Sequence, residues 1–227
     1  EGTAGGDQVM ERSEVRGQPP AATLVCFALE DEARAFRSLT AGRPHVSVLL
    51  TGIGKRNAER VVKEYLAQHS PLAVLTCGFA GGLNPELKMG DVVFETTDAS
   101  WKNQFTALGA KPIRFFCADR IATTVAEKAE LRKATRADAV EMESAAVARL
   151  CHERGISCAT VRVISDTATE DLPLNFNELA HPDLSLHYGK LAWAIAKAPG
   201  KIPALRRLQK STQFAARNLA DFLGKFV

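Results

Sequence analysis

The sequence predicts a three-layer α/β/α domain with a central mixed, largely parallel sheet and an amphipathic helix near its carboxyl end. Short apolar, β-branched runs alternate with segments of helical periodicity, which is typical of crossover units that feed a parallel sheet. The runs are almost continuously hydrophobic, as in strands covered on both faces. Since 227 residues with 46% hydrophobic residues suit one core, we expect a flexible tail over 1–20 and one domain over 21–227.

The expected elements follow one another along the chain. We expect strands over 22–29, 46–50, 72–79, 91–94, 113–117 and 158–165. We expect helices over 31–39, 55–69, 121–134, 142–154, 177–196 and 203–223. Ligands of such folds bind where the carboxyl ends of the strands meet loops and helix starts, so residues directly after each run are candidates for a site.

Composition and charge exclude several classes of protein. The formal net charge is +3, so nothing in the overall balance indicates a nucleic-acid partner. The five cysteines are widely spaced and mostly lie in apolar segments, which indicates reduced thiols and a cytoplasmic protein. The first twenty residues lack the pattern of a secretion signal, and no stretch approaches the roughly 18 apolar residues of a membrane-spanning helix.

Two glycine-rich stretches follow apolar runs. TGIGKR imitates the end of a phosphate-binding loop, but Leu49 stands where that motif needs its first glycine and Arg56 where it needs Ser or Thr. The glycine spacing in GFAGGL is not that of a dinucleotide fingerprint. Phe79, Ala80 and Gly81 of that stretch still allow a ligand to approach the backbone closely, and the alternative is a tight connection without a ligand.

Two glutamates stand at the start of an alanine-rich helical segment in VEMESAAVARLC. Carboxylates favour the amino end of a helix by a few tenths to about 1 kcal/mol, so one interpretation is that Glu141 and Glu143 only cap the helix. The alternative is that Glu143 accepts hydrogen bonds from sugar hydroxyls in the cleft, while Met142 offers an apolar surface to the sugar.

Asp166 comes directly after the buried run of VRVISDTATE. It can cap a turn or helix at the end of the strand. Near apolar walls it can instead hand a proton to a leaving group, an effect worth roughly 10²- to 10⁴-fold in rate. Arg162 in the same run needs a carboxylate or carbonyl partner, and we expect it to position Asp166 or Glu143.

Acids also follow the first apolar run, in FALEDEARAF. Glu30, Asp31 and Glu32 suit the amino end of a helix, and the alternative makes Glu32 a general base that activates water. The histidines and cysteines show neither HExxH nor CxxC spacing, so we expect no metal. No GxSxG elbow indicates a serine nucleophile.

Together, ALEDE, TGIGKRNAERV, CGFAGGLNPELKMGDVV, VEMESAAVARLC and VRVISDTATEDLPLNF occur in the order and approximate spacing of a known family. From about Thr23 to Leu179 the chain resembles the nucleoside phosphorylase and nucleosidase superfamily, which includes methylthioadenosine/S-adenosylhomocysteine nucleosidase. The resemblance implies that superfamily's form of the α/β/α fold. It also implies a purine nucleoside as the small-molecule substrate, no cofactor, and a homodimer.

The resemblance implies a role for the candidate residues. Asp166 protonates the five-membered-ring nitrogen of the base, with Ser165 and Arg162 orienting it, while Glu32 activates water and Glu143 binds the 2′- and 3′-hydroxyls. The remaining candidates for substrate contact are Glu141, Met142, Phe79, Ala80, Gly81, Ile121, Ala122 and Phe176. Among these, backbone groups around Ile121 are implied to read the purine edge.

Hydrolysis and phosphorolysis both remain open. Thr76 and Phe79 stand where the phosphorolytic branch has an arginine and a serine, and ALEDE matches the nucleosidase pattern, so hydrolysis is favoured. Phosphate is a co-substrate only if the protein is a purine nucleoside phosphorylase. The segment between Asp91 and Glu141 is shorter than in the nucleosidases, which leaves a catalytically silent nucleoside-binding protein as a further alternative.

The carboxyl-terminal third resembles the hopanoid-associated branch of the superfamily, which implies a bulky lipid 5′ substituent such as that of adenosylhopane. Residues 197–227 hold seven basic residues and one acid, and 203–223 carry an apolar stripe. A basic amphipathic helix of this kind suits peripheral contact with the inner surface of a membrane. The alternative is a terminal helix that packs on the core.

Overall fold

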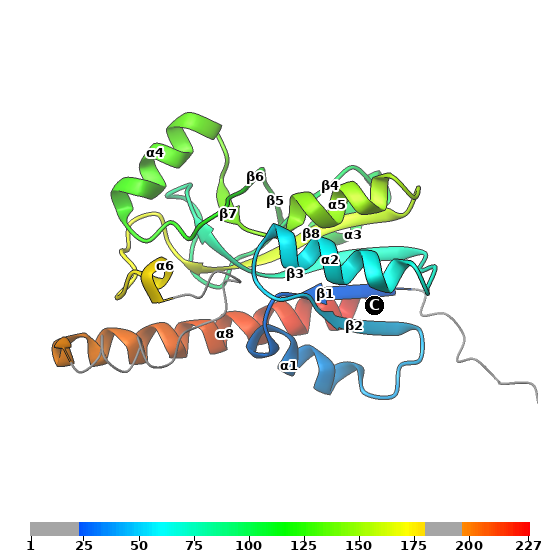
Figure 1. Ribbon diagram of the computed structural model, residues 1–227, viewed down its shortest axis with the longest axis horizontal. Helices are drawn as coiled ribbons and strands as arrows, with labels where there is room; N and C mark the ends of the chain where they lie inside the picture. The colour runs from blue at the N-terminus through cyan, green and yellow to red at the C-terminus, as the bar shows by residue number, and fades with distance from the viewer. Residues whose placement is uncertain (1–22, 180–196) are drawn as a thin grey trace, which may run out of the picture.

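The computed structural model describes residues 23–179 and 197–227. The tail expected over 1–20, and the part of the expected helix 177–196 that follows Leu179, lie outside the described residues. Within these ranges the expected fold class is confirmed: helices cover both faces of an eight-stranded mixed sheet (Figure 1).

The central strands of the sheet are parallel, and their carboxyl ends lie at one edge. The strands are β1 Thr23–Phe27, β2 Val46–Leu50, β3 Ala73–Gly82, β4 Val92–Thr96, β5 Lys111–Pro112, β6 Phe115–Cys117, β7 Ala139–Glu141 and β8 Ser157–Asp166. The main path runs β2-β1-β3-β8-β4-β5, with β1, β2, β3 and β8 parallel and β4 antiparallel to β8. The short strand β7 pairs antiparallel with the carboxyl end of β3, which brings the residues after β7 to the same edge as those after β8.

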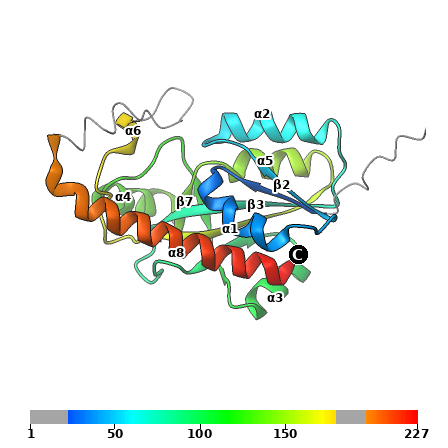
Figure 2. The ribbon, with the colours of Figure 1, turned by 90° about the horizontal axis from the view of Figure 1, so that it is seen from below.

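Two groups of helices cover the two faces. The helices are α1 Glu30–Thr40, α2 Lys55–Leu66, α3 Ala99–Ala107, α4 Val125–Thr135, α5 Ser144–His152, α6 Phe176–Leu179 and α8 Ile202–Phe226, with a 3₁₀ turn at Pro199–Lys201. Alternate residues of β1 face opposite layers: Leu24 and Cys26 pack with α2 and α5, whereas Val25 and Phe27 pack with α1 and α8. Figure 2 shows α2 and α5 above the sheet and α1 and α8 below it.

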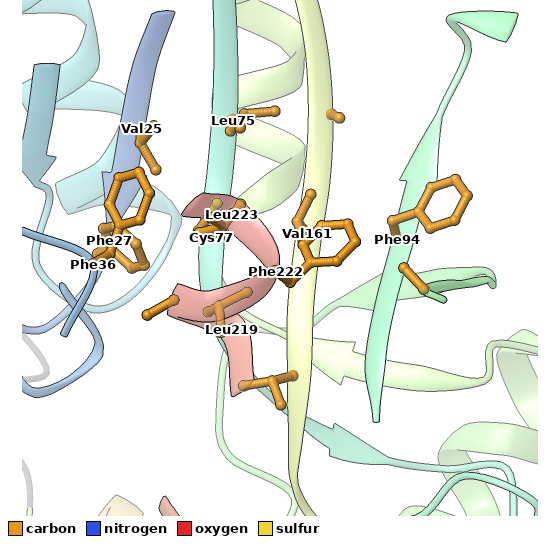
Figure 3. Packing of buried hydrophobic residues seen from close by; sticks show 14 of the residues in the cluster. Val25, Phe27, Phe36, Leu75, Cys77, Phe94, Val161, Leu219, Phe222 and Leu223 are labelled. Atoms are coloured by element: carbon orange, nitrogen blue, oxygen red, sulfur yellow. The ribbon is translucent and has the colours of Figure 1, made fainter. Parts of the chain in front are cut away.

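The long helix α8 completes the core with its carboxyl-terminal half. Leu219, Phe222 and Leu223 are buried against Val161 of β8 and neighbouring strand residues (Figure 3). Its first half carries exposed basic residues, and Phe214 is 51% exposed. Of the helices in the described ranges, none combines the length and apolar character that crossing a membrane would need.

The structure differs from the expected local structure at three places that matter for the site. The strand expected to end at Phe79 continues through Ala80 and Gly81 in β3 and pairs with β8, so the alternative of a tight connection does not hold for these residues. The helix expected from 121 begins at Val125, and the helix expected from 142 begins at Ser144. Four of the candidate site residues therefore lie in the segments that precede α4 and α5 and not within those helices: Ile121, Ala122, Met142 and Glu143.

Candidate active site

A cavity of about 260 Å³ lies where the carboxyl ends of β1, β3, β7 and β8 meet. Its lining includes all the site residues named from the sequence except Arg162: Glu32, Phe79, Ala80, Gly81, Ile121, Ala122, Glu141, Met142, Glu143, Ser165, Asp166 and Phe176. The structure therefore brings together residues from six separate stretches of the sequence.

Arg162 of β8 lies behind the cavity and binds two glutamates at once. Its Nη2 donates to Glu141 Oε2 at 2.7 Å, to Glu143 Oε2 at 3.4 Å and to Thr76 Oγ1 at 3.2 Å. Of the two expected partners, Arg162 contacts Glu143, whereas none of its hydrogen bonds reaches Asp166. Its Nε and Nη1 are buried and have no hydrogen-bond acceptor among the described residues.

Glu141 and Glu143 share the Arg162 guanidinium, and their pKa values shift in opposite directions. Burial alone would raise the pKa of Glu141, but the Arg162 charge and the Ser144 hydroxyl outweigh it and hold the pKa below its ordinary value. For Glu143 burial wins over the weaker contact with Arg162, and repulsion from Glu141 adds to it, so the pKa rises to about 7. Glu141 thus holds the arginine, and Glu143 can change charge near neutral pH.

The two glutamates at the start of α5 also differ in what they contact. Glu141 Oε2 accepts from the backbone N–H groups of Glu143 and Ser144 at 2.9 and 2.8 Å, so Glu141 has the capping role. Glu143 makes no such contact and instead accepts from the backbone N–H of Gly54 at 2.8 Å. Gly54 of TGIGKR therefore orients a carboxylate at the cavity. The resemblance of TGIGKR to the end of a phosphate-binding loop has no part in this contact.

Glu32 reaches the cavity from the first turn of α1. Its Oε2 accepts from the Leu29 N–H at 2.9 Å and its Oε1 from the Phe79 N–H at 2.8 Å. Burial raises the pKa of Glu32, although the Phe79 N–H and the Arg162 charge oppose the rise. Gly78 makes room for this carboxylate: a Cβ there would lie 2.6 Å from Glu32 Oε1, and the glycine has φ +148°.

Asp166 at the end of β8 has both carboxylate oxygens occupied. Ser165 Oγ donates to Oδ1 at 2.7 Å, and Lys128 Nζ lies 2.6 Å from Oδ2. Lys128 comes from α4, and its side chain is fully buried. The sequence gives no signal for this contact, since Lys128 is one of two lysines in AEKAELRK and its partner lies almost forty residues further along the chain.

The loop that was expected to read the purine edge is held by another side chain. Asn177 of α6 accepts from the Ile121 N–H and donates to the Ile121 carbonyl, both at 2.9 Å. In this conformation the Ile121 N–H is already paired, while its carbonyl oxygen keeps a second lone pair for another donor. Leu208 of α8, which was not among the expected site residues, lines the cavity together with Phe176.

The described part of the chain holds no group of three or more His, Cys, Asp or Glu side chains arranged for a metal ion. The acids of the cavity are instead bound by Arg162, Lys128 and backbone N–H groups.

Comparison with known proteins gives the family. The family model described as the phosphorylase superfamily matches residues 27–106 and 102–195. This chain belongs to the phosphorylase superfamily. A 5′-methylthioadenosine/S-adenosylhomocysteine nucleosidase of Anoxybacillus flavithermus is 28% identical over 192 residues, which cover 69% of this chain and 82% of that protein. An aminodeoxyfutalosine nucleosidase of Campylobacter jejuni is 28% identical over 160 residues, covering 56% of this chain and 69% of that protein.

Solved structures share the superfamily fold. The 5′-methylthioadenosine/S-adenosylhomocysteine nucleosidase of Campylobacter jejuni superposes with a TM-score of 0.67 at 18% identity, covering 90% of this chain and 97% of the other. The futalosine hydrolase of Helicobacter pylori superposes with a TM-score of 0.63 at 19% identity, covering 88% of this chain and 94% of the other.

Proposed function

We propose that this member of the superfamily is an enzyme that hydrolyses the N-glycosidic bond of a purine, adenosine-type nucleoside. The observation that carries the proposal is that Asp166, Glu143 and Glu32 line one small cavity although they come from the ends of β8, β7 and β1. Cleavage of this bond leaves the sugar cationic and the base anionic in the transition state. An acid at the base and carboxylates at the sugar stabilise these opposite charges.

Asp166 is the acid in this proposal. Its proton passes to the five-membered-ring nitrogen of the base, while the electrons of the C1′–N bond move onto the base. Ser165 holds the carboxyl through Oδ1. Gly81 leaves the space beside it open, since a Cβ at that position would lie 3.3 Å from Asp166 Oδ2.

Glu32 is the base that activates water. The water oxygen bonds to C1′ and its proton passes to the Glu32 carboxylate, so the released products are the free base and the free sugar. A raised pKa makes Glu32 a better proton acceptor near neutral pH. Two backbone N–H groups hold both oxygens in place before the substrate binds.

Glu143 and Met142 bind the sugar. The Glu143 carboxylate accepts hydrogen bonds from the 2′- and 3′-hydroxyls, and the Met142 thioether covers one face of the ring. Phe176 adds to the apolar wall.

Hydrolysis is favoured over phosphorolysis by the charges at the cavity. Among the described residues, each cation that lines the cavity or binds a lining residue is already paired with a carboxylate: Arg120 with Glu127, Lys128 with Asp166, and Arg162 with Glu141 and Glu143. A phosphate dianion would compete with these carboxylates. The phosphate-dependent purine nucleoside phosphorylase is the alternative, and a strict phosphate requirement would select it.

An apolar 5′ substituent is supported by the rest of the lining. Leu29, Leu172, Phe176 and Leu208 give the cavity an apolar side. A lipid nucleoside such as adenosylhopane, suggested by the resemblance to the hopanoid-associated branch, fits this lining. The exposed basic half of α8 would contact an anionic membrane surface where such a substrate is met, in a cytoplasmic homodimer.

A panel of adenosine derivatives tests the function. We expect free adenine from 5′-modified adenosines in phosphate-free buffer, at the same rate after phosphate is added. Tight binding of adenine without release from any derivative, in either buffer, would instead indicate the catalytically silent nucleoside-binding protein.

The membrane proposal needs point variants, because deleting the residues after Pro199 would remove the buried half of α8. Arg206, Arg207 and Lys210 are exposed, so reversing them to Glu leaves the core intact. We expect co-sedimentation with anionic phosphatidylglycerol vesicles to be lost in that variant. Equal sedimentation of variant and parent would contradict membrane contact through α8.

A further inference from the structure

Lys128 is a fully buried lysine whose ammonium group contacts the proposed catalytic acid. Its Nζ lies 2.6 Å from Asp166 Oδ2, and it donates to the carbonyl oxygens of Thr167 at 2.7 Å and Glu170 at 2.8 Å. An ammonium has three N–H donors, and these three acceptors use all of them. The contact is therefore a complete binding site for the lysine and not an incidental surface ion pair.

The contact joins two separate parts of the cavity. Lys128 stands on α4, directly after the loop that contributes Ile121 and Ala122 to the lining. The same helix start is tied to the segment after β8 by two more bonds, from the Val125 N–H to Asp171 Oδ1 at 2.6 Å and from the Leu172 N–H to the Thr123 carbonyl at 2.8 Å. Figures 1 and 2 both place α4 beside the chain that follows β8.

Burying a cation costs desolvation free energy, which only a nearby negative charge and hydrogen-bond acceptors offset. The two carbonyl contacts could be made by a neutral donor, but the positive charge pairs with one carboxylate among the described residues, that of Asp166. An apolar side chain at this position would also fill the space at lower cost in desolvation. The presence of a charged group against the proposed acid therefore points to a role in the reaction.

We propose that Lys128 is a positioning residue for Asp166 and stabilises the charge that the carboxyl carries after proton transfer. This inference rests on the proposed function. In this account Asp166 takes up a proton from solvent when the nucleoside binds. That proton then passes to the base nitrogen, the electrons of the bond between C1′ and the base move onto the base, and the carboxyl returns to the carboxylate that pairs with Lys128. The Lys128 ammonium, already in contact with Oδ2, stabilises this carboxylate without any reorganisation. Lys128 keeps its own protons throughout and does not touch the substrate.

Two substrates separate this role from a structural one. A nucleoside leaving group needs a proton from Asp166, whereas the 4-nitrophenolate of 4-nitrophenyl β-D-ribofuranoside departs without one. We expect Lys128→Met to lower kcat for the nucleoside by about 10²-fold, part of what a positioned general acid contributes. For the nitrophenyl riboside we expect kcat to remain at the level of the control Lys133→Met, which changes an exposed lysine of the same helix.

A double-variant comparison strengthens the test. Asp166→Asn should show the same split between the two substrates, and Lys128→Met should add no further loss of nucleoside turnover to Asp166→Asn. Lys128→Arg, which keeps the charge, should recover part of the loss. If Lys128→Met does not fold, as judged by circular dichroism, Lys128→Gln replaces it with the same expectations, and Lys128→Arg must still exceed Lys128→Gln.

Other outcomes overturn the inference. A folded Lys128→Met or Lys128→Gln variant that loses turnover of both substrates equally shows a structural role alone, and so does a loss that adds fully to that of Asp166→Asn. Unchanged nucleoside turnover excludes any role. Failure of the wild-type protein to cleave either substrate would instead refute the proposed function, and is thus distinguishable from a wrong role for Lys128.

Discussion

Arg162 and Glu141 form an ion pair of 2.7 Å in which the two side chains are 1% and 0% exposed. The pair fixes β8 to the end of β7, from which Met142 and Glu143 enter the cavity. Removing the cation would leave Glu141 buried with an uncompensated charge. We expect Arg162→Leu to lower the free energy of unfolding by about 3–5 kcal/mol, as for a broken buried ion pair.

Urea denaturation followed by circular dichroism measures this loss. Arg149→Leu is a matched control, because Arg149 pairs with Glu59 and Glu153 on the surface at half exposure. The control should change stability much less than Arg162→Leu, because an exposed ion pair is screened by solvent. Equal stability of Arg162→Leu and wild type would mean that the buried pair does not hold these strands together.

The pKa of Glu143 near 7 predicts a pH-dependent affinity for the sugar. Burial raises this pKa to about 7, so the group is a carboxylate above that pH and a neutral carboxyl below it. Since the carboxylate makes the stronger hydrogen bonds to hydroxyls, KM should rise as pH falls through 7, by at most about tenfold per pH unit. A 2′,3′-dideoxy analogue, measured as an inhibitor, should show no such dependence on pH. Parallel profiles for the hydroxylated and dideoxy ligands would exclude Glu143 as the sugar ligand.

Substitution of Gly78 should displace the Glu32 carboxylate and so lower turnover. In Gly78→Ala the new Cβ would lie 2.6 Å from Glu32 Oε1, so the carboxylate must move from its two N–H donors. We expect kcat to fall to the level of Glu32→Gln. Gly109→Ala is the control for backbone strain, because Gly109 has φ +91° and an added Cβ would meet nothing within 4 Å. If Gly78→Ala and Gly109→Ala have the same kcat, the position of Glu32 is not needed for turnover.

The position of Leu208 in the lining predicts a preference for adenosines with an apolar 5′ group. It is the residue by which α8 lines the cavity, next to an apolar set that includes Phe176. Leu208→Asp should lower kcat/KM for adenosines with apolar 5′ groups by about 10-fold or more, since even one methylene in an apolar pocket contributes roughly 1–3 kcal/mol. Adenosine itself should be much less affected. A uniform loss over the series would place Leu208 outside the 5′ subsite.

The sequence predicted those parts of the fold whose pattern is local. The runs at 46–50 and 158–165 are long enough and apolar enough to indicate buried strands, and β2 and β8 follow them closely. The helix α3 was missed because Phe105 is its one buried residue, although Asp98, which caps it through the Ser100 and Trp101 N–H groups, was a usable signal. Strand β7 was too short for periodicity to indicate.

The site could be predicted as a set of residues but not as a set of contacts. The motifs indicated which acids gather at the strand ends, because residues after parallel strands meet at one edge. They did not indicate that Arg162 forms an ion pair with Glu141, or that Lys128 forms one with Asp166. Both contacts depend on how α4 and α5 pack. Leu208 was missed because its helix reaches the cavity only through tertiary packing.

The central claim is that Asp166 supplies the proton on which cleavage depends, and Asp166→Asn tests it most directly. The amide keeps the shape of the side chain and can still contact Ser165, but it has no proton to give. We expect release of free adenine to fall by at least about 10²-fold, while circular dichroism and gel filtration match the wild type. A folded Asp166→Asn protein that releases adenine at nearly the wild-type rate would contradict the account.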